Sequence, residues 1–439
     1  MRNRIAAMPA GRRRALCYAA FAVYAAGVAL FSGPGLEHWW GAWAAGGYAA
    51  AAVIAAAARR QAWGAGLALA AACAGVLALP ALWLLTREPT PPDVAVVARS
   101  GVLLLHHGSP YLPRPALAAG GWLAYNPYLP VMALFGLPGA LGLAGQTWPG
   151  LIVVTFLLLY AAARVTLDGP DGPDGGPDGP GRGRRGALGQ AAFWLACPVM
   201  AFPLTMGITD PPVIALICLA LALLARSARS VGPGAPGSRA AALAAVVLGV
   251  ACATKYTAWP ALAVIAVMVA TRDGARSAVR FTAVTLAAAA GLVAALAPAA
   301  LGDPASLLQN TVAYPLGLTA ARSPAASPLP GHLLATLGSG GHLSALVLLA
   351  AAGLGTVASL VVAPPATPAA AARRVAAGLT ALFLLSPATR FGYFIYPVAL
   401  YAWAGLASRT EAGPADHPGD RPRADPPVSA AAVSGQPAW

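Results

Sequence analysis

Apolar runs long enough to cross a lipid bilayer recur along this chain. The first, at 15–31, contains no charged residue, and similar runs follow as far as 391–408. A helix of about 17 residues or more crosses a hydrocarbon core roughly 30 Å thick. Only helices and closed barrels satisfy their backbone polar groups there, and these runs lack the two-residue alternation of barrel strands. The sequence therefore predicts an all-α, polytopic transmembrane bundle.

The composition agrees with a surface that mostly faces lipid. Hydrophobic residues make up 58% of the chain and charged residues 10%, whereas a soluble domain carries about 25% charged residues. The net charge of +14 comes from short arginine clusters between the apolar runs. No basic stripe with interleaved aromatic residues and no nucleic-acid motif is present, so we exclude nucleic acid as a partner.

We expect about 12 spans, each with a boundary uncertainty of several residues. They are placed at 15–31, 40–58, 63–85, 149–166, 188–207, 211–226, 240–255, 257–271, 280–301, 343–363, 374–388 and 391–408. All but six of the 28 basic residues fall in the termini and in alternate loops. The positive-inside rule then predicts a multi-pass protein of the cell membrane with both termini in the cytoplasm.

The segments outside the spans divide into three kinds. Residues 1–410 are predicted to form a single transmembrane domain, and the polar, Pro-rich segment 411–439 a disordered cytoplasmic tail. Residues 167–187 are predicted to be a cytoplasmic linker, because their Gly/Pro/Asp repeat offers no side chains that pack. Two long external segments remain, at about 86–148 and 302–341, and loops of this length usually carry function.

The stretch 128–146 is apolar enough to span but is interrupted by Pro130, Pro138 and several glycines. Counting it as a span would place the arginine-rich linker outside, against the charge rule. We interpret it as a re-entrant or interfacial helix, which needs protein cover at membrane depth.

Of the 14 acidic residues, only five fall on the predicted external side: Glu37, Glu88, Asp93, Asp210 and Asp303. Asp93 follows two prolines and opens the segment 93–108. Its position alone favours a helix N-cap, in which the carboxylate accepts backbone N–H bonds. A carboxylate that is not engaged in capping has the chemistry of a general base.

Two polar clusters follow Asp93. His106 and His107 lack the partners of a zinc site, and the five cysteines lie inside apolar runs without a C-x-x-C pair, so no metal site is predicted. The stretch 125–128 (YNPY) is either an aromatic-belt anchor or a rim that contacts a lipid or sugar.

Three charged residues stand apart from the arginine clusters. Asp210 lies at the external tip of a hairpin, where capping the next helix and facing a site are equally favoured. Lys255 is the chain's single lysine, and it either snorkels to the interface or marks a functional position. Arg390 is either an isolated interfacial charge or a clamp for a lipid phosphate.

This inventory suits sugar transfer from a lipid phosphate. The phosphate is already a good leaving group, so one carboxylate to deprotonate the acceptor and one cation to hold the phosphate are sufficient. A glycosidase needs a pair of carboxyl groups, for which the external side offers little.

The run Asp93-x-x-Val96-Val97, then Leu103-Leu104-x-x-x-Gly108-x-Pro110-Tyr111, then Tyr125-Asn126-Pro127-Tyr128, resembles glycosyltransferase family 87. These are polyprenyl-phosphate-mannose-dependent alpha-mannosyltransferases of actinobacteria with the C-type membrane glycosyltransferase fold. The resemblance implies that Asp93 is the catalytic base and that residues 127–130 lie beside the donor site. The chain departs from the family pattern at Val97, where Tyr is frequent, and at 126–128, where Tyr-Pro-Pro is more usual.

We therefore expect a membrane glycosyltransferase that moves a hexose, mannose by resemblance, from a polyprenyl-phosphate donor to an extracytoplasmic glycan or glycolipid, with Asp93 as base. Residues predicted to hold the donor phosphate and lipid are Arg390, Lys255, Tyr128 and Asn126. Residues predicted to orient the acceptor are Asp210, His107 and Tyr111. No cofactor is predicted, and a divalent cation beside Asp210 stays open.

A transporter or flippase for a lipid-linked sugar is the main alternative, because the broken stretch 128–146 and the Lys255 hairpin are features of transport pathways. No inverted repeat is visible in the sequence, and no carboxylate sits convincingly within a span. A non-catalytic membrane scaffold is the second alternative, for which two long external segments are needlessly elaborate.

Overall fold

The computed structural model describes residues 8–33, 35–58, 61, 63–86, 91–143, 145, 147–167, 179–231 and 239–411. Residues 412–439 of the predicted tail and residues 168–178 of the predicted linker lie outside these ranges. Residues 179–187 belong to a helix, so the linker is shorter than its composition suggested. Within the described ranges the chain is helical, and its single β feature is an isolated bridge between Ala326 and Thr389. The predicted all-α class is confirmed.

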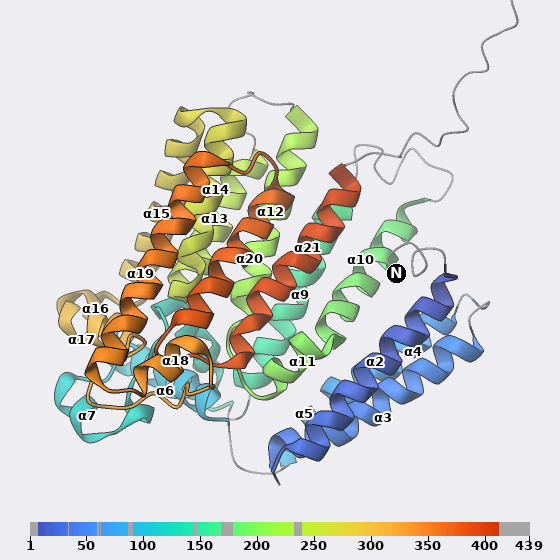
Figure 1. Cartoon of the computed structure of the whole chain (residues 1–439), viewed down its shortest axis with the longest axis horizontal. Coiled ribbons are helices and arrows are strands. Elements are labelled where there is room, and N and C mark those ends of the chain that lie inside the picture. The colour runs from blue at the N-terminus through green and yellow to red at the C-terminus, as the bar shows by residue number, and fades with distance from the viewer. Residues whose placement is uncertain are drawn as a thin grey trace, which may run out of the picture.

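The first four helices of the described residues form an N-terminal layer against the bundle, drawn in blue in Figure 1. They are α2 (Ala10–Phe31), α3 (Leu36–Ala57), α4 (Gly64–Cys73) and α5 (Leu79–Thr86), the last two joined by the π-helical turn η1 (Ala74–Ala78). A Cβ built on Gly47 of α3 would lie 2.7 Å from the Cα of Gly75 in η1. The two backbones therefore touch, which only glycines allow at this crossing.

The main bundle follows the N-terminal layer (Figure 1). Its long helices are α9 (Thr147–Leu167), α10 (Gly179–Ala196), α12 (Pro211–Val231), α13 (Arg239–Thr254), α14 (Trp259–Asp273), α15 (Ala275–Leu296), α19 (Ser339–Val362), α20 (Pro368–Leu385) and α21 (Ile395–Glu411). In α12, 83% of the apolar stretch is buried, against 11% in α2 and in α19. α12 lies in the centre of the bundle, where it packs against α9 and α13.

The described helices that are long enough to span a membrane number fewer than the predicted spans. Eight described helices are long and apolar enough to cross a membrane, or nine if one bent pair counts as a span. The spans predicted at 240–255, 257–271 and 391–408 form as helices α13, α14 and α21, of 16, 15 and 17 residues. Length therefore supports fewer full spans than the predicted dozen.

The predicted span 188–207 is broken near its middle. α10 ends at Ala196, α11 (Pro198–Thr205) begins two residues later, and the two axes meet at 61°. Cys197 is extended, with φ −65° and ψ 134°. A residue that precedes proline is driven out of the helical region by the proline ring. The Cys197-Pro198 step is thus the physical cause of the bend.

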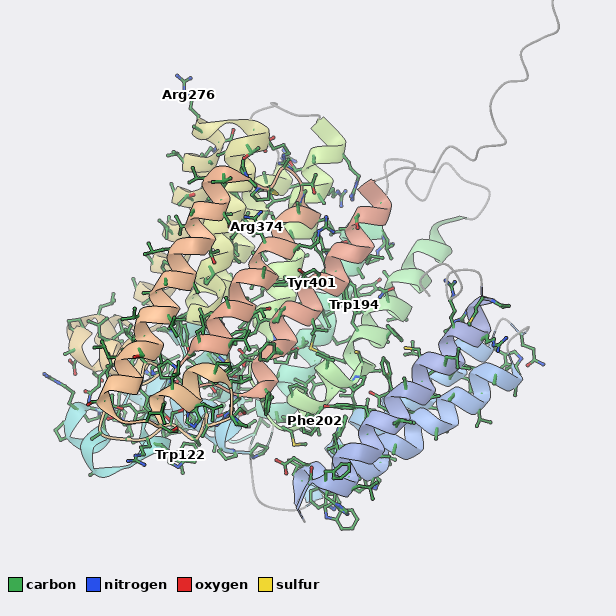
Figure 2. The ribbon with its side chains drawn as sticks, viewed as in Figure 1. Trp122, Trp194, Phe202, Arg276, Arg374 and Tyr401 are labelled. Atoms are coloured by element: carbon green, nitrogen blue, oxygen red, sulfur yellow. The ribbon has the colours of Figure 1, made fainter. Side chains whose placement is uncertain are left out.

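The two long segments predicted to be external, which keep the name external segments, gather at one end of the bundle. The first contains α6 (Pro92–His107), α7 (Arg114–Ala119), the 3₁₀ helices η2 (Trp122–Ala124) and η3 (Pro130–Gly136), and α8 (Leu137–Ala140). The second contains α17 (Pro304–Leu308), the π-helical turn η5 (Gln309–Ala313) and α18 (Pro330–Ala335), preceded by α16 (Pro298–Gly302). Figure 2 shows Trp122 at this end and Arg276 at the opposite end.

The stretch predicted to re-enter or lie at the interface forms only the short helical unit 130–140, which falls below the length of a span. It lies against α6 at two glycines. A Cβ on Gly101 would lie 2.2 Å from the carbonyl carbon of Gly136. This contact leaves no room for a side chain, and it fixes α6, which carries Asp93 in its first turn, against η3.

Candidate active site

An open cavity of about 660 Å³ lies among the external segments and the adjoining helix ends. Its lining combines two carboxylates, two cations and six aromatic side chains, drawn from distant parts of the chain. The charged residues are Asp93, Asp210, Lys255 and Arg390. The aromatic residues are Trp122, Tyr125, Tyr128, Tyr256, Tyr314 and Tyr393. The four charged residues singled out from the sequence therefore share one site.

Asp93 faces the cavity and does not cap its helix. The N-cap position of α6 is Pro91, and no side-chain cap hydrogen bond is formed there. The carboxylate instead accepts a hydrogen bond from Arg390, with 2.9 Å between Oδ2 and the guanidinium nitrogen. The preference for an N-cap was wrong because the proline that precedes the helix takes that position. A carboxylate in the first turn still gains from the helix dipole.

Arg390 is held in place by the second external segment. Thr389 N–H donates to the carbonyl of Ala325 at 2.8 Å, and Ser327 N–H donates to the carbonyl of Thr389 at 2.9 Å. Phe391 N–H donates to the Ser327 hydroxyl at 3.1 Å. These bonds clamp the chain on both sides of Arg390 in an extended conformation. The guanidinium thus enters the cavity from a fixed backbone.

The Asp93–Arg390 pair is partly open to solvent, with side-chain exposures of 22% and 27%. Burial lowers the pKa of Arg390, but Asp93 and the neighbouring tyrosines together raise it by more, so the net shift is upward. Arg390 therefore stays cationic. Its planar fork matches the oxygens of a carboxylate or a phosphate.

Lys255 and Asp210 form a second, buried ion pair. Lys255 Nζ lies 2.7 Å from Asp210 Oδ1, and the side chains are 6% and 1% exposed. Nζ also lies 5.2 Å and 5.5 Å from the ring centroids of Tyr128 and Tyr393. Lys255 is therefore paired inside the protein and does not snorkel to the interface. The Asp210 side chain takes this partner while its backbone carbonyl accepts from the first turn of α12.

Two aromatic rings join the external segments across the cavity. Tyr125 and Tyr314 stack with centroids 4.6 Å apart and planes 10° from parallel. Tyr314 was not singled out from the sequence, because an aromatic residue in a long loop carries no local signal. Only the length of the segment 302–341 indicated that it would contribute to a functional site.

Three predicted site residues lie outside the lining. Tyr111 donates its hydroxyl to the carbonyl of Tyr128 at 2.9 Å. Asn126 accepts from Tyr128 N–H at 3.1 Å and donates its amide to the carbonyl of Pro110 at 3.1 Å. Both side chains thus support the loop that presents Tyr128. His107 is exposed at the end of α6 and does not line the cavity.

The charged side chains of the cavity form two separate ion pairs. Within the described ranges, no three His, Cys, Asp or Glu side chains come close enough together to hold a metal ion. Each cavity carboxylate is paired with its own cation.

Comparison with known proteins gives one result. The model of glycosyltransferase family 87 matches residues 126–387, more than half of the chain. The searches of curated proteins and of solved structures each found no match. The matched region includes Tyr128, Asp210, Lys255 and Tyr314, while Asp93 and Arg390 flank it on either side.

Proposed function

This chain belongs to glycosyltransferase family 87, and from that premise we propose that it transfers a hexose from a polyprenyl-phosphate donor to a glycan or glycolipid acceptor. The chain is a membrane glycosyltransferase. The lipid-phosphate donor is supported by the chemistry of the cavity and by the sequence motif after Asp93, and the choice of mannose is supported by that motif alone. No cofactor enters the proposed reaction.

The observation that carries the proposal is the Asp93–Arg390 pair in the wall of the cavity. Asp93 takes the proton of an acceptor hydroxyl as the acceptor oxygen bonds to the anomeric carbon of the hexose. The bond from that carbon to the phosphate oxygen breaks at the same time, and its electron pair leaves with the lipid phosphate. Arg390 binds the departing phosphate. A single direct displacement inverts the anomeric centre.

The two side chains touch, yet base and leaving group act on opposite faces of the sugar carbon. The donor must therefore separate them. Its phosphate competes with Asp93 for the guanidinium, and the freed carboxylate is then available to the acceptor. In the proposed reaction, the ion pair therefore opens when the donor binds.

We propose that the cavity faces the extracytoplasmic side and that both termini are cytoplasmic. The arginine clusters support this orientation, since Arg276 and Arg374 lie away from the end that carries Trp122 (Figure 2). A polyprenyl-phosphate sugar in the outer leaflet would then present its sugar to the cavity.

The test is transfer from radiolabelled mannosyl polyprenyl phosphate by the purified protein in liposomes. We expect Asp93→Asn to lower the rate about 10²-fold to 10⁴-fold, the usual range for loss of a general base. Glu37→Gln is the matched control, because Glu37 is an exposed carboxylate of the N-terminal layer. Undiminished transfer by Asp93→Asn would reject the role of the base.

The same liposomes test the alternative of a transporter or flippase. Movement of the lipid-linked sugar between leaflets with no glycosylated product would favour transport over transfer.

A further inference from the structure

The buried pair of Lys255 and Asp210 is only half satisfied as a structural ion pair. Asp210 Oδ1 accepts from Lys255 Nζ, but Asp210 Oδ2 is buried and makes no close hydrogen bond within the described residues. The Tyr396 hydroxyl lies beside the Asp210 side chain, and its close hydrogen bond, at 2.6 Å, is with Thr257. A buried charge without its full set of hydrogen bonds costs free energy. A pair kept only for stability has no reason to leave this oxygen unpaired.

The ammonium group of Lys255 also has N–H donors that make no hydrogen bond to any described residue. It carries three N–H donors, and its single hydrogen bond within the described residues goes to Asp210. Both residues line the cavity. The pair therefore presents an unfilled acceptor and unused donors side by side.

Adjacent hydroxyl groups on a hexose match this arrangement. Each hydroxyl both donates and accepts, so one can donate to Asp210 Oδ2 while its neighbour accepts from Lys255 Nζ. A phosphate does not fit, since it is an anion with no proton to give and would meet the Asp210 carboxylate at close range. The rings of Tyr128 and Tyr393 flank the ammonium and also line the cavity.

We propose that Lys255 and Asp210 recognise hydroxyl groups of the transferred hexose and so set the donor-sugar specificity, an inference that rests on the glycosyl-transfer function proposed above. Each ion pair binds a different part of the lipid-linked sugar donor. Arg390, 27% exposed, binds the phosphate, and the more deeply buried pair, 6% and 1% exposed, binds the sugar. In this proposal Lys255 binds the sugar, whereas the sequence alone led us to expect it at the donor phosphate.

The experiment measures binding of two lipids to the full-length protein in nanodiscs. One is a short-chain polyprenyl phosphate without sugar, and the other is the same lipid carrying mannose or glucose. We expect Asp210→Asn and Lys255→Met each to weaken binding of the preferred sugar-bearing lipid about 10-fold to 100-fold, the usual range for a hydrogen bond to a charged group. Binding of the sugar-free lipid should change less than about 3-fold. Arg390→Gln should weaken both lipids.

Three controls keep the outcome decisive. Asp273→Asn removes the carboxylate of another close ion pair, Arg272–Asp273 at 2.6 Å, that lies outside the cavity lining, and it should change neither affinity. The double variant Asp210→Asn/Lys255→Met leaves no buried charge if a single variant fails to fold. Lipids carrying hexoses that lack one hydroxyl test the unaltered protein, and at least one of them should bind about 10-fold more weakly.

Two results would overturn the proposal. An equal loss of affinity for both lipids in Asp210→Asn and Lys255→Met would assign the pair to the phosphate. If the unaltered protein bound all the deoxy-hexosyl lipids equally, the pair would make no hydrogen bond to a sugar hydroxyl. Asp210 Oδ2 would then accept from water instead. Failure of the unaltered protein to bind either lipid would instead reject the proposed function, so the two failures are distinguishable.

Discussion

At the scale of single residues, the cavity uses two ion pairs of different character. Asp93 and Arg390 are partly exposed and can separate, whereas Asp210 and Lys255 are almost fully buried. Separating a buried pair leaves an uncompensated charge in a medium of low dielectric constant, which is costly. We therefore propose that the exposed pair separates when the substrate binds and that the buried pair stays intact and recognises the sugar.

This division predicts how Arg390 responds to substitution. Arg390→Gln frees Asp93 but removes the cation that holds the phosphate, so transfer should fall about 10²-fold or more. Arg390→Lys should recover only part of the rate, since an ammonium keeps the charge but loses the planar fork. Steady-state kinetics with the lipid donor gives kcat and KM for each variant. If Arg390→Gln and Arg390→Lys were both as active as the unaltered enzyme, charge and geometry at this position would be irrelevant to the reaction.

At the scale of elements, the position of Asp93 depends on the contact between α6 and η3. Gly101 and Gly136 bring the two backbones together, and a Cβ on Gly101 would meet the carbonyl carbon of Gly136 at 2.2 Å. Backbone cannot give way as the tip of a flexible side chain can. Any residue larger than glycine at position 101 must displace α6, and Asp93 moves with it.

We therefore predict that Gly101→Ala lowers both thermal stability and transfer. Alanine normally stabilises a helix relative to glycine by about 1 kcal/mol, so a net loss would measure the clash. Transfer should fall about 10-fold or more, because small misplacements of a catalytic group are costly. Gly139→Ala is the matched control in α8, where an added Cβ meets nothing within 4 Å. A fully active, more stable Gly101→Ala protein would contradict the tight contact.

At the scale of the whole molecule, the fold class could be predicted because the length of an apolar run is a local property. Asp93, Asp210, Lys255 and Arg390 could each be singled out as charges among apolar residues. Their pairing could not be predicted, since Asp93 and Arg390 are 297 positions apart. The residues next to each of them in the sequence do not indicate which residue is the partner. The bend between α10 and α11, at the Cys197-Pro198 step, was not predicted, since 188–207 was expected to form one span.

The stack of Tyr125 on Tyr314 escaped prediction for a related reason. It depends on how two external segments fold over the same helix ends, which is a property of the assembled bundle. The preference for an N-cap at Asp93 failed because a pattern within one helix cannot reveal a competing partner elsewhere in the chain.

Orientation in the membrane is the last property of the whole molecule that the proposed reaction requires. His107 is exposed near the external segments, and Arg276 is exposed at the opposite end of the bundle (Figure 2). In a cysteine-free background, we predict that a membrane-impermeant maleimide labels His107→Cys in intact cells and labels Arg276→Cys only after lysis. The reverse pattern would place Asp93 in the cytosol. The enzyme would then have to take its lipid-linked sugar from the inner leaflet, and the positive-inside rule would fail for a chain in which all but six of 28 basic residues obey it.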